Sequence, residues 1–130
     1  MELQPTPSVT TGFGFGRAVP DLATDADPQT GYLVYGASLG GLNEYGGTSF
    51  VAPQLNGANA VIDSYLGHRV GFWNPVLYAA AGGFNSPFTQ LNQAGTSNDN
   101  IYYTGNPGEI YNEGIGLGQP DLAELARDFG

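Results

Sequence analysis

Apolar residues recur at close to helical spacing along one long segment of the chain. The positions that share this spacing are Phe50, Val51, Ala52, Leu55, Ala58, Val61, Ile62, Tyr65 and Leu66. The pattern predicts a helix whose apolar face covers well over half of its circumference, so we expect it to be buried on several sides. Pro53 fits only the first turn of a helix, where a missing backbone N–H costs nothing, and this places the helix start within a residue or two of Ser49.

Shorter apolar runs, bounded by glycine and proline, predict the remaining elements. The expected strands are Tyr32–Tyr35, Leu42–Tyr45 and Ile101–Tyr103, and the expected further helices are Val76–Ala81 and Pro120–Phe129, with Pro120 at the first helical position. Residues 1–12 are expected to be a loose lead-in. No composition shift marks an internal boundary, so residues 1–130 are predicted to belong to one domain.

Ser49 follows a turn made of Gly46, Gly47 and Thr48 and opens the predicted long helix. One interpretation is an N-cap, because serine is favoured there for local hydrogen bonding. The other is a catalytic nucleophile whose oxyanion is stabilised by the unpaired N–H groups and positive end of the helix. Paired glycines favour the nucleophile, since a cap does not need them but a backbone that a substrate approaches closely does. Position alone leaves both interpretations open.

The serine segment also resembles a known motif. Gly47-Thr48-Ser49 followed by Pro53 is similar to the Gly-Thr-Ser-x-x-x-Pro motif that subtilisin-like proteases share with the acid-acting sedolisin family of serine-carboxyl peptidases, which includes the kumamolisins. Other blocks resemble the sedolisins in the same order along residues 14–125: Arg17–Ala23, Asp25–Tyr32, Gly71–Tyr78 and Gly116–Pro120.

The resemblance implies an α/β fold, namely the C-terminal portion of a subtilisin-like parallel-sheet catalytic domain. Its nucleophile would be Ser49, at the N-terminus of a buried helix, with Gly46, Gly47 and Thr48 in the substrate and oxyanion region. The resemblance further implies an extracellular enzyme that acts on polypeptides. Residues 1–12 lack the basic start and apolar stretch of a signal peptide, so we expect such a signal to lie upstream.

The single histidine, His68, is excluded as the base for Ser49. A catalytic base lies within about 3 Å of its nucleophile. His68 follows Gly67, the expected C-cap of the helix that Ser49 begins, and such a helix separates its two ends by about 25 Å. The base must then be a carboxylate, as the resemblance to sedolisins, with their Glu and Asp, implies.

Sedolisins carry that pair as Glu-x-x-x-Asp far upstream of the serine, and the 48 residues before Ser49 contain no match. Asp21 and Asp25 have the same spacing but lie in a segment typical of turns. Glu124 and Asp128 fit a terminal helix, where they are interpreted as a solvated face. The chain is therefore expected to need the N-terminal part of the catalytic domain and to be inactive alone.

Sedolisins also bind calcium near the C-terminus, through an Asp-Ile pair and a later Gly-x-Gly-x-Asp segment. Here the pair is replaced by Gln90-Leu91, which exchanges a charged ligand for a neutral amide. The later segment has altered spacing around Gly105, Gly108, Glu109 and Asn112, and Asp99 is interpreted as a turn residue. Calcium remains possible by resemblance only, with altered ligand positions, and no other cofactor is expected.

Composition excludes several partners. The formal net charge is −9 and the chain contains no lysine, which argues against nucleic acid and anionic membranes. No apolar run is long enough to span a membrane. Two functions remain: a fragment of an acid-acting serine endopeptidase, whose Glu/Asp base comes from upstream sequence, or a non-catalytic truncated remnant or binding module that retains the fold.

Overall fold

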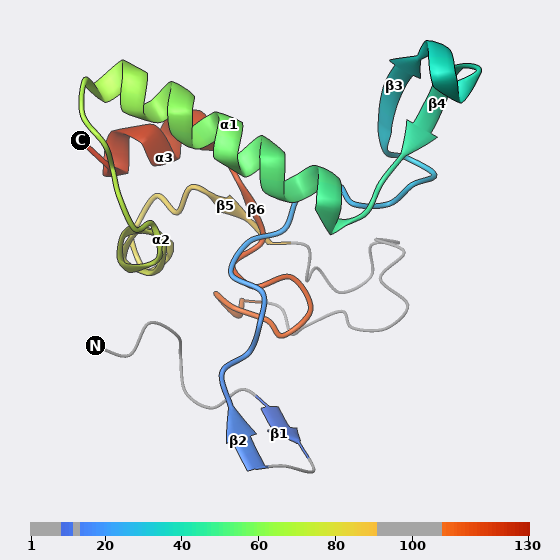
Figure 1. Ribbon diagram of the computed structural model, residues 1–130. Coiled ribbons are helices and arrows are strands. Elements are labelled where there is room, and N and C mark those ends of the chain that lie inside the picture. Colours follow the sequence, from blue (N-terminus) through green and yellow to red (C-terminus); the bar gives the residue numbers. More distant parts are fainter. Residues whose placement is uncertain (1–8, 12–13, 91–107) are drawn as a thin grey trace. The chain divides into compact units, whose positions relative to one another are not determined.

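The computed structural model describes residues 9–11, 14–90 and 108–130, and its mixture of helices and strands confirms the expected α/β composition (Figure 1). The chain divides into two compact units. One consists of Thr24–Val70, and the other combines Met1–Ala23 with Gly71–Gly130. We describe each unit by itself. The predicted strand Ile101–Tyr103 lies outside the described residues.

Unit 24–70 contains a hairpin followed by the long helix. Strands β3 (Tyr32–Gly36) and β4 (Gly41–Tyr45) pair antiparallel, with the 3-10 helix η1 (Ala37–Leu39) between them. Helix α1 (Thr48–Leu66) comes directly after the hairpin. Both strands and the long helix are confirmed at the places where short apolar runs, helical spacing and glycine predicted them.

Helix α1 ends as the sequence predicts. Gly67 adopts the left-handed conformation, at φ 75°, and its N–H donates to the carbonyl of Asp63. The Asp63 side chain accepts a second hydrogen bond, at 2.9 Å, from the backbone N–H of Val70. The chain is thus fastened on both sides of the helix end, and this fixes the length of α1.

The burial on several sides that we expect of this helix is not supplied by the other elements of its unit. Ile62 is the one buried residue of α1, whereas Val61 and Tyr65 are 69% and 74% exposed. The reason is a shortage of covering structure, because the only other elements of the unit are a two-stranded hairpin and one turn of 3-10 helix. The apolar face of α1 therefore exceeds the surface available to cover it.

The other unit contains two short antiparallel pairs and two helices. Strand β1 (Val9–Thr11) pairs with β2 (Gly14–Gly16), and β5 (Phe88–Thr89) pairs with β6 (Gln119–Pro120). The predicted loose lead-in is thus a strand at residues 9–11. All described strand pairs are antiparallel, and the parallel sheet that the resemblance implies is not found among the described strands.

Helices α2 (Asn74–Ala81) and α3 (Leu122–Asp128) supply most of the core of this unit. The buried cluster consists of Leu77, Ala81, Leu117 and Leu125. Trp73 and Phe129 pack against it with their rings 5.1 Å apart. The α2 helix matches its prediction, with Pro75 in its first turn and Gly82 at its end.

The last helix begins later than predicted. Pro120 belongs to strand β6, and Asp121 is the N-cap of α3, accepting hydrogen bonds from the N–H groups of Ala123 and Glu124. Pro120 pairs with Phe88, so a partner distant in sequence holds this proline in an extended conformation. The prediction of Pro120 at the first helical position is therefore wrong.

An ion pair and several long-range hydrogen bonds join the N-terminal segment of this unit to the rest of it. Asp21 Oδ1 accepts from the Tyr78 hydroxyl at 2.7 Å and from the Arg17 guanidinium. The Asp21 carbonyl accepts from the N–H of Leu117, and the Tyr111 hydroxyl donates to the carbonyl of Pro20. Two of the blocks that resemble sedolisins, 17–23 and 116–120, thus contact one another.

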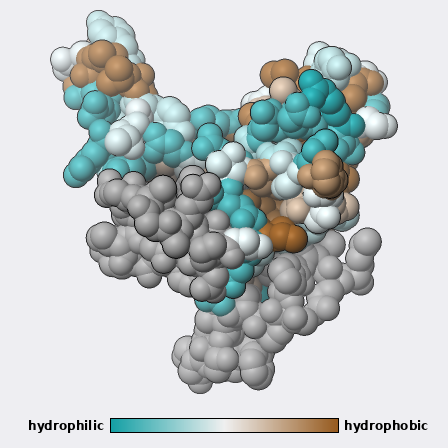
Figure 2. Space-filling model, turned by 180° about the vertical axis from the view of Figure 1, so that it is seen from behind, coloured by the Kyte–Doolittle hydropathy of each residue, from teal (hydrophilic) through white to brown (hydrophobic). Residues whose placement is uncertain are grey.

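The β3–β4 hairpin presents an apolar face to solvent. Its strongly exposed apolar residues are Leu33, Tyr35, Leu39 and Leu42. Tyr35 and Leu42 are direct cross-strand partners, and Figure 2 shows hydrophobic surface at this end of the unit.

Among the described residues, no helix is both long and apolar enough to cross a bilayer.

Candidate active site

Ser49 is exposed and is the second residue of α1. The N-cap is Gly47, at φ 94° and ψ 161°, a conformation that glycine adopts far more readily than other residues. The chain therefore turns into the helix two residues before Ser49. The N-cap interpretation of Ser49 is therefore wrong, and no side-chain hydrogen bond caps the first turn of α1.

The turn before the serine is packed backbone against backbone. The N–H of Gly47 donates to the carbonyl of Ala26 at 2.6 Å. A Cβ atom at Gly46 would lie 2.4 Å from the nitrogen of Pro28 and 2.6 Å from the oxygen of Ala26. Gly46 is thus required because another stretch of backbone occupies the space of a side chain.

In the predicted oxyanion region, some backbone N–H groups already donate to a carbonyl and others do not. Gly47 uses its N–H on Ala26, and the N–H of Phe50 donates to the Gly47 carbonyl at 3.0 Å. The N–H groups of Thr48 and Ser49 belong to the first turn, where the helix itself offers no acceptor. The donors available to an anion at this helix end are therefore those of Thr48 and Ser49. Gly46 and Gly47 shape the turn.

Pro53 lies five residues after Thr48, in the second turn of α1, so its predicted place in the first turn is wrong. Proline has no N–H, and the carbonyl of Ser49 consequently receives no hydrogen bond from residue 53. The helix continues past this gap without a break. The backbone of Ser49 is therefore less constrained by the helix than the backbone of an ordinary first-turn residue.

His68 lies just beyond the far end of α1. Its side chain is exposed, and its Nδ1 lies 3.2 Å from the carbonyl oxygen of Leu66. The helix between Ser49 and His68 is continuous, which corresponds to a separation of about 25 Å. The predicted separation of serine and histidine is confirmed.

The carboxylates of unit 24–70 do not pair with the serine. Asp25 accepts from the N–H of Asp27 at 3.1 Å, and Asp27 accepts from the N–H of Gln29 at 2.9 Å. Asp63 caps the end of α1, and Glu44 lies on β4 opposite Leu33. In this unit, all of which the structure describes, none of them accepts a hydrogen bond from Ser49.

The two carboxylate pairs with Glu-x-x-x-Asp spacing have other surroundings. Asp21 and Asp25 lie in an extended, turn-rich segment, as predicted. Glu124 and Asp128 lie on α3 with both side chains exposed, and Glu124 forms an ion pair with Arg127. This arrangement matches the predicted solvated face.

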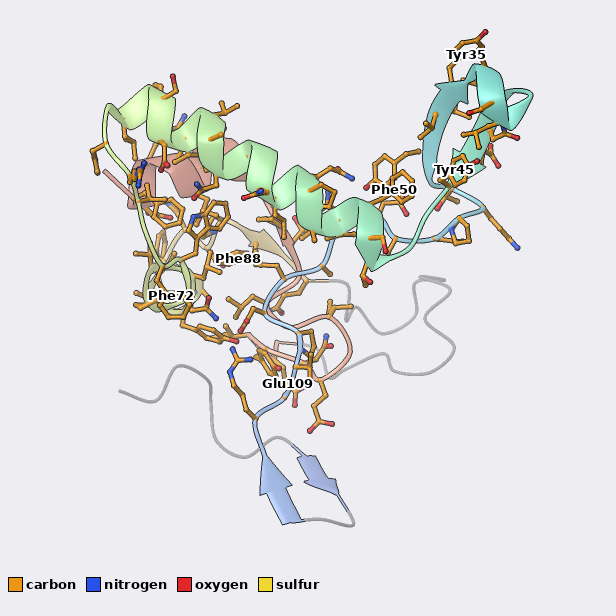
Figure 3. The ribbon with its side chains drawn as sticks, viewed as in Figure 1. Tyr35, Tyr45, Phe50, Phe72, Phe88 and Glu109 are labelled. Carbon is orange, nitrogen blue, oxygen red and sulfur yellow. The ribbon has the colours of Figure 1, made fainter. Side chains whose placement is uncertain are left out.

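Sequence reasoning missed the aromatic residues beside the serine turn. Tyr32 begins β3, Tyr45 ends β4, and Phe50 directly follows Ser49. The Phe50 ring stacks on Tyr32 with centroids 5.9 Å apart and on Tyr45 with centroids 5.7 Å apart. Figure 3 shows Tyr45 and Phe50 together at the base of the hairpin and Tyr35 at its far end. Tyr45 and Phe50, which flank the glycine turn in the sequence, were the available signal.

The described residues of the predicted calcium region do not form a carboxylate-lined site. Asn112 is buried, and its Oδ1 accepts from the N–H groups of Gly114 and Ile115, so it stabilises its own turn. Gln90 remains a neutral amide. Within the described ranges, no three His, Cys, Asp or Glu side chains gather as metal ligands. Leu91, Asp99 and Gly105 lie outside the described residues, and calcium stays a prediction.

Two curated proteins match most of the chain. Kumamolisin of Bacillus sp. (strain MN-32) is 40% identical over 114 residues, which are 88% of this chain and 20% of kumamolisin. Sedolisin of Pseudomonas sp. (strain 101) is 32% identical over 121 residues, which are 92% of this chain and 20% of sedolisin. The chain thus spans about a fifth of the length of the curated relatives it matches. No protein-family model matches it.

Proposed function

Because this chain is related to the sedolisin family of peptidases over most of its length, we propose that it is part of a serine endopeptidase and that Ser49 is its nucleophile. The proposal concerns a fragment of a catalytic domain with a subtilisin-like fold. We also propose that the complete enzyme is extracellular, acts at acid pH and cleaves polypeptides.

The observation that carries the proposal is the setting of Ser49. The side chain is exposed at the start of α1, and the glycine turn before it is fixed against another stretch of backbone. A serine that only caps a helix needs neither feature. A serine that attacks a substrate needs access for the substrate and a fixed direction of approach.

The chemistry follows from this setting. The Ser49 hydroxyl oxygen attacks the carbonyl carbon of a peptide bond and gives up its proton to a base. The oxyanion of the tetrahedral intermediate is stabilised by the N–H groups of Thr48 and Ser49 at the positive end of α1. The base returns this proton to the leaving nitrogen as the intermediate collapses, so that a neutral amine departs and an acyl-enzyme remains, which water then hydrolyses.

We propose that the base is a carboxylate supplied from outside these 130 residues. Asp25, Asp27 and Asp63 are engaged with backbone N–H groups, and His68 is at the opposite end of α1. We therefore propose that the Glu and Asp residues are supplied by the N-terminal part of the catalytic domain. The chain alone is then inactive, although it holds the nucleophile.

A graft tests this function. Kumamolisin, with its matched segment replaced by this chain, should hydrolyse casein at acid pH, and Ser49→Ala should abolish the hydrolysis. Thr10→Ala and Ser38→Ala are hydroxyl controls elsewhere in the chain and should remain active. The 130-residue chain alone should show no hydrolysis. Activity that survives Ser49→Ala would exclude Ser49 as the nucleophile, whereas a graft without any activity would favour a non-catalytic remnant.

A further inference from the structure

Two hydrogen bonds attach residues 25–31 to the serine turn and its aromatic neighbours. The N–H of Gly47 donates to the carbonyl of Ala26 at 2.6 Å. The hydroxyl of Tyr32 donates to the carbonyl of Asp25 at 2.8 Å. Neighbouring carbonyls of one short segment thus hold the cap of α1 and the first residue of β3.

The same segment meets the serine turn at van der Waals distance. A Cβ atom at Gly46 would lie 2.4 Å from the nitrogen of Pro28, and one at Gly31 would lie 2.2 Å from the oxygen of Tyr45. Real Cβ atoms do not approach backbone atoms below 3.0 Å. The two stretches of backbone therefore cannot slide past one another without losing this packing.

Residues 25–31 are themselves ordered by local hydrogen bonds. Asp25 Oδ1 accepts from the N–H of Asp27, and Asp27 Oδ1 accepts from the N–H of Gln29. Aspartate favours such turns because its short side chain reaches the backbone two residues on. The segment consequently offers the Ala26 carbonyl in a fixed direction.

The aromatic stack closes the arrangement on the helix side. Phe50 follows Ser49 in the chain, and its ring lies against both Tyr32 and Tyr45, at interplanar angles of 9° and 19°. Aromatic pairs of this kind contribute beyond the area that they bury. The helix start is thus tied to the base of the hairpin by a side chain adjacent to the serine.

We propose that residues 25–31 and the Tyr32–Phe50–Tyr45 stack form a clamp that positions Ser49 for attack. The proposal rests on the proposed function and adds Tyr32 and Phe50 as positioning residues for it. The clamp fixes Gly46 and Gly47 from one side and Phe50 from the other. Ser49, between them, can remain exposed to substrate and still keep one orientation.

Hydrogen–deuterium exchange of the Gly47 N–H in the 130-residue chain tests the clamp directly. Tyr32→Phe removes the hydroxyl that bonds Asp25, and Phe50→Leu removes the stack. Each should accelerate exchange about tenfold, and Phe50→Tyr should restore the slow rate. Tyr35→Phe is the matched control at the exposed, far end of the hairpin and should change nothing. Fast exchange in the unaltered chain, or equal effects of Tyr32→Phe and Tyr35→Phe, would overturn the clamp.

The kumamolisin graft separates the clamp from the proposed function. Phe50→Leu should lower kcat for peptide hydrolysis about tenfold with KM changed less than twofold, and Phe50→Tyr should rescue it. Faster exchange of Gly47 with an unchanged kcat would overturn the positioning role and leave Ser49 as nucleophile. An inactive graft, or one that survives Ser49→Ala, would refute the proposed function while the exchange result still decides whether the clamp exists.

Discussion

Gly46→Ala adds one methyl group at the tightest point of the serine turn. The new Cβ would lie 2.4 Å from the nitrogen of Pro28, 2.6 Å from the oxygen of Ala26 and 2.7 Å from the carbonyl carbon of Asp27. All three are backbone atoms, which cannot rotate away. Ordinary contact begins at 3.4 Å, so the turn must move by 3.4 − 2.4, roughly 1 Å, relative to residues 26–28.

The expected size of the effect follows from this displacement and from the usual cost of overpacking. Overpacking of this kind costs about 1–3 kcal/mol, which corresponds to exchange of the Gly47 N–H that is about 5 to 150 times faster. A catalytic group misplaced by about 1 Å loses about 10²-fold in rate. Because the displaced segment carries Ser49, we expect a loss of that order in kcat for the kumamolisin graft.

Gly57→Ala is the matched control. Gly57 lies in the interior of α1 with no heavy atom within 4 Å of a new Cβ, and alanine favours a helix interior over glycine by about 1 kcal/mol. This variant should keep full activity and slow the exchange of α1 amides, as measured by mass spectrometry. Equal activities for the two alanine variants would refute the claim that backbone packing at Gly46 fixes the serine.

Three other substitutions test neighbouring conclusions. Pro53→Ala should stabilise α1 by about 1–3 kcal/mol, seen as slower amide exchange after residue 53, because Ser49 regains a hydrogen-bond donor; unchanged exchange would contradict this. Asn112→Ala should destabilise the unit by about 2 kcal/mol in urea unfolding, because two N–H groups lose their acceptor, whereas Glu113→Ala should be neutral. Glu124→Gln should leave the activity of the graft unchanged, since Glu124 pairs with Arg127; an inactive variant would show that this carboxylate is catalytic.

Sequence reasoning was most successful where an element depends on its own residues. Helical spacing and Gly67 predicted the course and the end of α1, and short apolar runs bounded by glycine predicted both strands of the hairpin. Asn74-Pro75 and Gly82 likewise bounded α2. In each case the signal and the structure that it determines lie within one turn or one strand, so no distant contact is needed to interpret them.

Two of the wrong predictions depend on distant backbone. The cap of α1 is Gly47 because its N–H bonds Ala26, which lies 21 residues earlier. Pro120 is extended because it pairs with Phe88. Proline and serine have local preferences for helix starts, but a hydrogen bond from a segment elsewhere in the chain outweighs a preference of about 1 kcal/mol. Sequence spacing alone does not reveal such partners.

The candidate site follows the same rule: its local features could be predicted from the sequence, and its long-range contacts could not. The motif indicated Ser49, and the geometry of a single helix excluded His68. The aromatic stack was not predicted, because Tyr32 and Tyr45 come together with Phe50 only through the register of the hairpin. Register depends on which strand residues pair, and a two-stranded hairpin with mixed polarity on both faces specifies this weakly in the sequence.

The proposed clamp also explains how a nucleophile can be positioned by one segment of a chain while its base comes from another. Every contact that fixes the serine turn comes from residues 25–50, within one compact unit. In the proposed function the helix start supplies the oxyanion donors and the glycine turn supplies access, so neither depends on a base. The base needs only to reach the exposed face of Ser49. Under the proposed function, a carboxylate from a different segment can therefore complete the site without reshaping the serine turn.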